Sequence, residues 1–491
     1  MITFKIDVMK RKVIHAVIKL LIDMKNLDIV LTNGRVVTEK GIENCDIGIF
    51  EGKICALGQL NSNAKIIEDA TDLIILPGGI DAHVHIDQPS GPDVEMADNF
   101  QSATKSAAAG GSTTVLPFAM QEKGQSLREC VKNYHAKAKD NLFVDTSFHL
   151  IISDPSAQVL GQELPALARD GYTSFKVFMT YDDLVLNDEE LLKVFEVAKK
   201  EKTLVMVHAE GYDAIRYLTK KLEDEGKLAP YYHGLSRPQI VEREATHRAI
   251  SHAQIVDIPI VIVHVSGNEA LSQIKWAKEN GIKVFSETCP QYICLTEDDM
   301  KGLNMDFEGA KYVCSPPPRD RESQEAIWEG IIDGTFDIFS SDHCPFKFKD
   351  KKGKDRPGAR TSFKWVPNGI PGVETRLPIL FSEGVSKNRI SIERFVELTS
   401  TNPAKMYGLY PQKGSIKIGS DADLTIWDPN KVKKIKQADL HHGSDYTPYE
   451  NLEIKGWPIQ TWLRGQKIYE HNKFITQKNL GRYVSRDFCL L

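Results

Sequence analysis

The sequence has no feature that points to a membrane or to a nucleic acid. None of its apolar runs approaches the roughly 20 residues that a membrane-spanning helix requires. The formal net charge of -5 shows no basic surplus, which a nucleic-acid partner would favour. We therefore expect a protein without a membrane partner and without a nucleic-acid partner.

Paired cysteines are also missing. The eight cysteines are scattered, and no two of them are separated by only two residues. This spacing argues against a thiolate zinc knuckle and against a Cys-x-x-Cys redox pair. Buried thiols in a reducing compartment are the simpler interpretation, so we expect a cytoplasmic protein.

The length and composition are those of a large globular protein. At 491 residues the chain is too long for one ordinary core, and its 41% hydrophobic and 26% charged residues are typical of folded domains. Residues 1–25 are expected to be an N-terminal extension, whose apolar run at 13–22 is too broken for a signal sequence. A frayed amphipathic helix and a true start at Met24 are the two interpretations.

Short β-branched runs separated by turn glycines occur near both ends of the chain. They predict strands over residues 26–77 and again over 410–470. The simplest arrangement joins the two segments in one β-sandwich domain, with the middle of the chain inserted between them. Residues 471–491 form a polar C-terminal tail that we expect to reach a neighbouring subunit.

Between these segments, residues 78–409 alternate short apolar strands with longer helical patterns, which is typical of a parallel sheet. Helical patterns cover residues 97–109, 188–200, 237–256 and 268–279. Strands are expected at 80–85, 113–118, 145–152, 173–178, 203–208, 259–264, 282–286 and 336–342. Eight such units predict an α/β fold with a TIM (β/α)8 barrel.

The first of these strands ends in two histidines. His83 and His85 lie two residues apart, so they project from the same side of a strand. Two imidazoles at one place make half of a metal site. Taken alone, the pair also fits an ordinary solvated strand face.

The ends of the other strands supply further ligands. Barrel enzymes place their chemistry at the C-terminal ends of the strands, so polar residues there meet at one rim. Strands four, five, six and eight carry or end at Lys176, His208, His264 and Asp342. Imidazole together with carboxylate suits zinc, and the absence of cysteine ligands is typical of an open, catalytic site.

Lys176 is an unusual residue for an apolar strand, because an unpaired buried ammonium is costly. Burial lowers the pKa of a lysine, which can then be a free amine. Such an amine can add carbon dioxide and give an anionic carbamate that bridges two metal ions. A buried ion pair is the alternative.

These motifs resemble those of the cyclic amidohydrolases, specifically the dihydropyrimidinase and D-hydantoinase family. The resemblance runs from about Leu27 to Tyr469. Its segments are 77–85 (PGGIDAHVH), 173–181 (TSFKVFMTY), 207–210 (VHAE), 263–266 (VHVS), 315–319 (SPPPR), 341–346 (SDHCPF) and 367–374 (PNGIPGVE). The family fold is a TIM barrel with a β-sandwich built from both chain ends, as expected above.

The resemblance also implies two zinc ions per subunit, bridged by carboxylated Lys176 (N6-carboxylysine) and a hydroxide. His83 and His85 would hold the more buried ion together with Asp342. The more exposed ion would be held by His208 and His264. A homotetramer, or a homodimer, is the implied assembly.

The implied reaction is hydrolysis of the cyclic amide of a small-molecule substrate, which gives an N-carbamoyl amino acid. Dihydropyrimidines (dihydrouracil, dihydrothymine) and 5-substituted hydantoins are the candidate rings. Tyr181 would stabilise the oxyanion, and Asp342 would transfer the proton. Backbone groups of Ser315 and Asn368 would bind the imide edge of the ring.

Allantoinase and dihydroorotase share this metal set and are the nearest enzymatic alternatives. Dihydroorotase typically has an arginine just after the His-x-His pair, and residues 86–88 (IDQ) contain none. A non-enzymatic scaffold relative would lack the metal ligands, whereas this chain keeps all of them. We therefore expect an enzyme.

Two positions depart from the family pattern. Ser90 stands where many relatives have a bulky apolar residue, and Gly211 stands where many have asparagine. Ser90 is expected near Phe178 and Val185, beside the exocyclic group of the ring. Losing an apolar contact there predicts a preference for small rings such as dihydrouracil over 5-phenylhydantoin.

Overall fold

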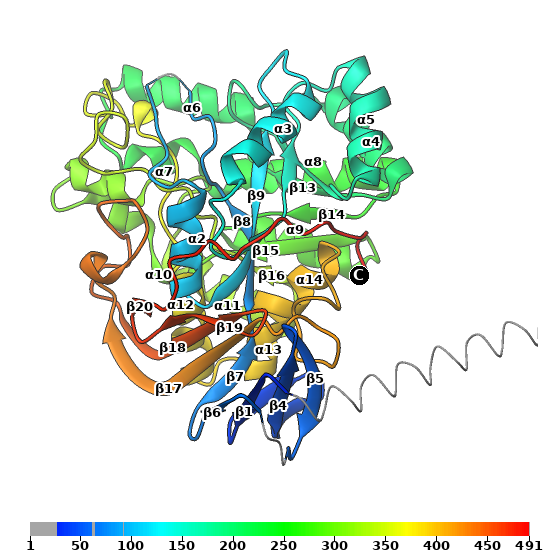
Figure 1. The fold of residues 1–491 in the computed structure, drawn as a ribbon. Helices are drawn as coiled ribbons and strands as arrows, with labels where there is room; N and C mark the ends of the chain where they lie inside the picture. The colour runs from blue at the N-terminus through cyan, green and yellow to red at the C-terminus, as the bar shows by residue number, and fades with distance from the viewer. Residues whose placement is uncertain (1–26, 61–63, 92, 491) are drawn as a thin grey trace, which may run out of the picture.

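The computed structural model describes residues 27–60, 64–91 and 93–490, so the extension expected at residues 1–25 lies outside them. Parallel strands at its centre form a nearly closed barrel (Figure 1). The first and last of them approach at a parallel bridge between Val84 and His343. The strands are β8 (Gly79–Val84), β9 (Ser112–Met120), β10 (Asp145–Thr146), β11 (His149–Ile151), β12 (Ser174–Phe178), β13 (Leu204–His208), β14 (Ile260–Ile262), β15 (Val284–Thr288) and β16 (Ile338–Phe339). The predicted α/β fold with a TIM barrel is therefore confirmed.

One barrel strand differs from its prediction, because the single strand expected at 145–152 is two short strands. β10 pairs with β9, whereas β11 pairs with both β9 and β12. Between them, the Phe148 carbonyl accepts a hydrogen bond from the Arg486 guanidinium instead of continuing the ladder. A contact from the far end of the chain thus interrupts this strand.

The helical patterns correspond to α2 (Phe100–Ala109), α5 (Asp188–Glu201), α8 (Gln239–Val256) and α9 (Asn268–Glu279). α5 begins where it does because Asn187 and Glu190 form a reciprocal capping box. The other helices are α3 (Leu127–Ala138), α4 (Leu164–Arg169), α6 (Tyr212–Asp224), α7 (Tyr232–Ser236), α10 (Gln291–Cys294), α11 (Arg321–Asp333), α12 (Arg376–Leu380), α13 (Ile392–Val396) and α14 (Asn402–Met406). No helix among the described residues is long and apolar enough to cross a bilayer.

Two further sheets pack face to face beside the barrel. A four-stranded sheet has the order β5 (Lys53–Gly58), β4 (Asp46–Phe50), β1 (Ile29–Thr32), β6 (Ile66–Asp69). A seven-stranded sheet has the order β20 (Lys473–Phe474), β19 (Gln466–Glu470), β18 (Glu453–Leu463), β17 (Leu424–Lys434), β7 (Ile74–Pro77), β2 (Arg35–Thr38), β3 (Gly41–Asn44). Leu31 and Ile47 of the first sheet share one buried cluster with Ile75, Leu424 and Trp462 of the second.

Both chain ends build this sandwich, as expected. β7 pairs with β17 in antiparallel register, so that Ile75 lies opposite Ile426. Figure 1 shows the blue N-terminal strands beside the orange and red C-terminal strands at one end of the molecule.

The C-terminal tail packs on its own barrel, and its expected contact with a neighbouring subunit stays a prediction. The Thr146 amide donates to the Arg482 carbonyl at 3.0 Å, and the Val484 amide donates to the Thr146 carbonyl at 2.7 Å. Arg486 is buried and donates to Ser174 and Phe148. The short strand β10 leaves backbone groups unpaired, and the tail satisfies them.

Candidate active site

The six side chains predicted as metal ligands lie together at the C-terminal rim of the barrel. β8 carries His83, β12 carries Lys176 and β13 ends at His208. His85, His264 and Asp342 follow the ends of β8, β14 and β16. All of them except His83, which is fully buried behind the others, line a cavity of about 470 Å³.

One half of the cluster is centred on Asp342. Its Oδ1 lies 3.3 Å from His83 Nε2 and 3.4 Å from His85 Nε2. Lys176 Nζ lies 3.5 Å from His83 Nε2. Two imidazoles, a carboxylate and an amine therefore converge on one point, with ligand atoms of His83, His85 and Asp342 close enough to share one ion.

The other half consists of His208 and His264, whose ring centroids are 4.4 Å apart. The His264 ring is 5.4 Å from that of His83, so the two halves adjoin. His264 Nδ1 is buried and finds no hydrogen-bond partner among the described residues. A buried nitrogen without a partner indicates a group that the protein side chains do not supply.

Three of the histidines are oriented by a second polar side chain. His83 Nδ1 bonds to Glu287 at 2.6 Å, His85 Nδ1 to Gln88 at 2.7 Å and His208 Nε2 to Glu210 at 2.7 Å. Each contact fixes the ring and leaves its other nitrogen directed elsewhere, as in metal-binding histidines. The donor set therefore fits a metal centre built from imidazole and carboxylate.

The sequence prediction did not include these orienting residues. Glu287 lies on β15, one residue beyond the predicted strand at 282–286. Glu210 is paired with Arg237 at 2.7 Å, and both are buried. A carboxylate at a barrel strand end was the available signal for Glu287 and Glu210. Arg237 lies in the short connection between α7 and α8, where no such signal exists.

Lys176 lies in an apolar environment, as predicted. Its side chain is fully buried, and Nζ lies 5.4 Å and 5.2 Å from the ring centroids of Phe118 and Phe178. Burial lowers the pKa of Lys176 to about 8, although Glu287 and Asp342 oppose the shift. About a tenth of this side chain is therefore an uncharged amine at pH 7, far more than in an unperturbed lysine.

Tyr181, Ser315 and Asn368 also come together. The side chains of Ser315 and Asn368 lie close enough to the Tyr181 hydroxyl to favour its ionised form, but burial outweighs them and raises the pKa of Tyr181 to about 12. All three residues line the same cavity as the metal-ligand candidates. Ser315 also contacts the buried ring of His233, which bonds to the Cys314 carbonyl at 2.9 Å.

Three residues of this cluster have left-handed backbones. The φ angles are 71° for Tyr181, 41° for His264 and 49° for Asp342. Side chains other than glycine adopt this region at a cost, and such residues concentrate at functional sites. The surrounding packing therefore holds these three in positions that the backbone alone would not favour.

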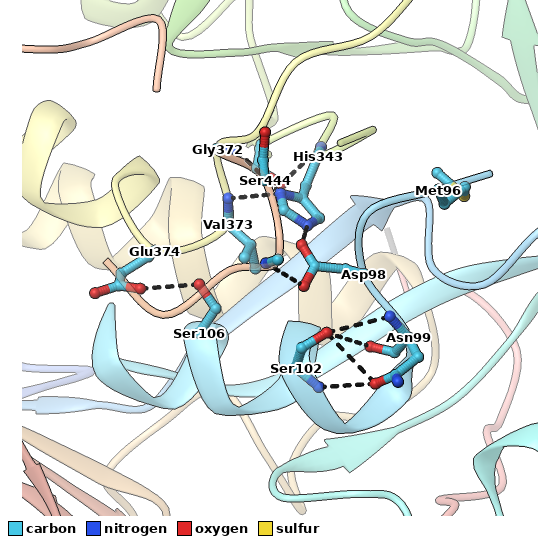
Figure 2. Close-up of polar contacts among 12 residues, drawn as sticks. Met96, Asp98, Asn99, Ser102, Ser106, His343, Gly372, Val373, Glu374 and Ser444 are labelled. Atoms are coloured by element: carbon cyan, nitrogen blue, oxygen red, sulfur yellow. Dashed lines mark hydrogen bonds and ion pairs between the residues drawn. The ribbon is translucent and has the colours of Figure 1, made fainter. Parts of the chain in front are cut away.

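The residue after Asp342, His343, forms a buried histidine–aspartate pair with Asp98 (Figure 2). His343 Nε2 bonds to Asp98 at 3.0 Å, and His343 Nδ1 accepts from the amides of Gly372 and Val373. The His343 carbonyl accepts from the His85 amide at 2.6 Å. His343 therefore links the neighbouring Asp342 to the end of β8 and to the loop that follows Asn368.

A second acidic cluster already contains its own cation. Asp145, Asp421 and Asp423 bring carboxylate oxygens close together. The Lys413 ammonium contacts all three, so a lysine and not a metal ion neutralises them. This cluster lies between the barrel and the sandwich and does not belong to the site.

The cavity walls include both expected and unexpected residues. Ser90 and Phe178 line the cavity, as expected, but Val185 does not, and its neighbour Leu184 takes that place. Apolar wall is added by Val94, Met96, Met120, Ile151, Phe346, Trp365 and Val366. The cavity therefore has apolar surface that does not depend on position 90.

Comparisons with known proteins identify the family. Residues 74–468 match the amidohydrolase family, and residues 11–82 match the N-terminal domain of the urease alpha-subunit. The D-hydantoinase of Ralstonia pickettii is 42% identical over 461 residues, which is 94% of this chain and 99% of that protein.

Solved structures agree with the sequence match. A D-hydantoinase structure superposes with a TM-score of 0.91 at 42% identity, covering 94% of this chain and 99% of that one. The dihydropyrimidinase of Brevibacillus agri gives 0.90 at 40% identity, with 94% and 99% covered. This agreement confirms the predicted enzyme class over the non-enzymatic alternative. The chain belongs to the amidohydrolase family and, within it, to the hydantoinase and dihydropyrimidinase group of cyclic amide hydrolases.

Proposed function

We propose that the protein is a zinc-dependent enzyme that opens the ring of 5-substituted hydantoins and dihydropyrimidines to N-carbamoyl amino acids. The observation that carries this proposal is the convergence of four histidines, three of them oriented by a second polar side chain, with Asp342 and a buried lysine at one rim of the barrel. The names of the D-hydantoinase and dihydropyrimidinase relatives support the choice of ring.

The metal would be a pair of zinc ions. His83, His85 and Asp342 would hold one, and His208 and His264 the other, with Lys176 between them. When bound, the ions lower the pKa of a water molecule and polarise the amide carbonyl.

Lys176 would act as its N6-carboxy derivative. The uncharged amine adds to carbon dioxide, one N–C bond forms and one proton leaves, which gives an anionic carbamate. The burial that lowers the lysine pKa favours the amine required for this step. The carbamate would replace an ammonium, which repels metal ions, by two oxygen ligands.

Asp342 and Tyr181 would carry out the proton and charge chemistry. Asp342 takes the proton of the attacking water and passes it to the ring nitrogen as the C–N bond breaks. The Tyr181 hydroxyl faces the cavity and donates to the oxyanion of the tetrahedral intermediate. A pKa raised by burial keeps this hydroxyl protonated at neutral pH.

Ser315 and Asn368 would recognise the ring, because both lie beside Tyr181 at the cavity wall. The expected preference for small rings rested on the missing apolar contact at Ser90. The apolar wall around Met96, Leu184 and Phe346 supplies that contact from elsewhere, so we propose that rings with a bulky 5-substituent are substrates as well.

The assembly and location belong to the same proposal. We propose a cytoplasmic homotetramer, with a homodimer as the alternative. Light scattering after gel filtration at several protein concentrations would show four, two or one chain per particle.

The proposed reaction is tested with purified enzyme supplied with zinc. Hydantoin, dihydrouracil and allantoin are incubated separately, and the N-carbamoyl products are quantified by chromatography. We expect about two metal ions per chain and turnover of hydantoin and dihydrouracil. Full metal occupancy without turnover of either ring, or turnover of allantoin alone, would reject this function.

A further inference from the structure

Lys354 is a second buried lysine, outside the metal cluster. Its side chain is fully buried, and no carboxylate among the described residues compensates its charge. A buried ammonium without a counter-ion is expensive, so its direct contacts must justify its position.

Those contacts are two backbone carbonyls from separate segments. Lys354 Nζ donates to the Val313 carbonyl at 2.7 Å and to the Pro367 carbonyl at 2.6 Å. The Gly369 amide donates to the same Val313 carbonyl at 3.0 Å. The lysine therefore joins two chain segments that also touch each other directly.

The two segments are those that carry the proposed ring-binding residues. Val313 lies two residues before Ser315, and Pro367 lies immediately before Asn368. The ring is proposed to be bound through backbone groups at both positions, so their spacing must match the edge of the substrate. A shift of one segment against the other would misplace these groups.

We propose that Lys354 is a positioning residue that sets the spacing of the two segments which recognise the substrate ring. This inference rests on the proposed function and assigns Lys354 no contact with the substrate. The contact persists in either protonation state, because a neutral amine has two N–H groups and an ammonium has three.

The environment agrees with this role. Burial lowers the pKa of Lys354 to about 7, which is the sign of a cation held without an anionic partner. Phe346, which lines the cavity, lies beside the lysine with its ring centroid 6.0 Å from Nζ. The loop that carries Lys354 also contributes Arg356 to the cavity wall.

The test compares three variants with the wild-type holoenzyme. Lys354→Met keeps an unbranched apolar side chain, one atom shorter than lysine, and has no donor. Lys354→Gln has the same length as Lys354→Met but carries an amide, which can donate to one carbonyl at a time. Lys349→Met removes an exposed lysine from the same loop and serves as the matched control.

We expect Lys354→Met to raise KM for hydantoin by about 10-fold or more while kcat changes by less than about 3-fold. Metal content should equal that of wild type, because Lys354 contacts none of the metal-ligand candidates. Lys354→Gln should fall between wild type and Lys354→Met, and Lys349→Met should match wild type.

Unchanged KM in folded Lys354→Met would overturn the proposal, as would a loss confined to kcat or to metal content. If Lys354→Met does not fold, Lys354→Gln decides, and a wild-type KM in that variant would overturn it. Wild-type enzyme that binds metal but turns over no ring would instead reject the proposed function.

Discussion

At the scale of single residues, two buried lysines have different environments. Lys176 faces histidines and Asp342 across the cluster, whereas Lys354 faces only carbonyl oxygens. Burial lowers the pKa of both. Only Lys176 lies where a carbamate would meet the proposed metal ligands. A lowered lysine pKa therefore accompanies two different proposed roles, a metal bridge for Lys176 and a positioning contact for Lys354.

The carbamate is tested by removing the amine. Lys176→Ala should lose most of its metal and lower kcat by at least about 100-fold, since even outer contacts of metal ligands are worth about 10–100-fold. Short carboxylic acids should restore part of the activity by occupying the place of the carbamate. The exposed Lys193→Ala is the control. Two bound metal ions with normal turnover in Lys176→Ala would contradict the prediction.

Asp342 is expected to be both ligand and proton carrier. Asp342→Asn keeps an oxygen for the metal but cannot accept the proton, so kcat should fall by at least about 100-fold with metal retained. Metal analysis and steady-state kinetics on the same sample separate the two roles. Turnover close to that of wild type with metal bound would assign the base to another residue.

The sequence brought out the proposed metal-binding side chains but not the residues that orient them. His83, His85, Lys176, His208, His264 and Asp342 were found because every one lies in or just after a barrel strand, where the fold brings strand ends together. Lys354 and Asp98 lie in loops with no periodic pattern. Their partners are distant in the chain, so nothing local marks them.

At the scale of elements, the barrel strands were located within a few residues, because apolar runs mark them. The exception is 145–152, where the tail from residues 482–486 separates β10 from β11. Loops were not predictable in this way. The loop after β8 contributes Ser90, Val94 and Met96 to the cavity, and Asp98 anchors its end.

Asp98 is expected to position Asp342 through His343. One carboxylate oxygen accepts from the Gly443 amide at 2.7 Å and the other bonds to His343 Nε2. In Asp98→Asn one of the two oxygens becomes an NH2 group, which cannot accept a hydrogen bond. Either the Gly443 amide or His343 Nε2 therefore loses its acceptor. We expect kcat to fall by about 10-fold with KM and metal content unchanged, because a small misplacement of a reacting group is costly.

Asp93→Asn is the matched control for this variant, since it makes the same change at an exposed position of the same loop. A purely structural role for Asp98 would lower the unfolding temperature and leave kcat per folded enzyme unchanged. That outcome would contradict the prediction.

At the scale of the whole molecule, the chain ends hold the barrel and the sandwich together. Lys413 contacts Asp145 of β10 as well as Asp421 and Asp423, and Arg464 from the β18–β19 turn also binds Asp145. A sandwich from both ends was predictable from strand patterns. This charge cluster was not, because its members come from segments that only the fold brings together.

The cluster also gives the molecule a specific dependence on pH. Burial lowers the pKa of Lys413, but Asp423, Asp145 and Asp421 outweigh it and raise the pKa above 10.5, so its stabilisation is complete below that value. Burial raises the pKa of Asp421, but Lys413 and Lys53 outweigh it and hold the pKa below 3.8. Its stabilisation is therefore present above 3.8 and lost as the pH falls further. Burial raises the pKa of Asp423 above 3.8 although Lys413 opposes the shift, so ionisation of Asp423 costs stability just above that value. The wild-type cluster should therefore contribute a constant stability only between the pH at which Asp423 is fully ionised and 10.5.

Lys413→Met should leave the buried Asp423 carboxylate without its cation, whereas Arg464 still pairs with Asp145 and Lys53 with Asp421. We expect the free energy of unfolding to fall by about 3–5 kcal/mol at neutral pH, the usual cost of breaking a buried pair. Without Lys413, burial raises the pKa of Asp423 unopposed by that lysine, so acidification neutralises this carboxylate and the deficit should shrink between about pH 7.5 and about pH 5. Urea unfolding at both pH values measures the deficit, with the exposed Lys417→Met as control. A deficit that is the same at both pH values would show that Lys413 stabilises the junction by packing and not by its charge.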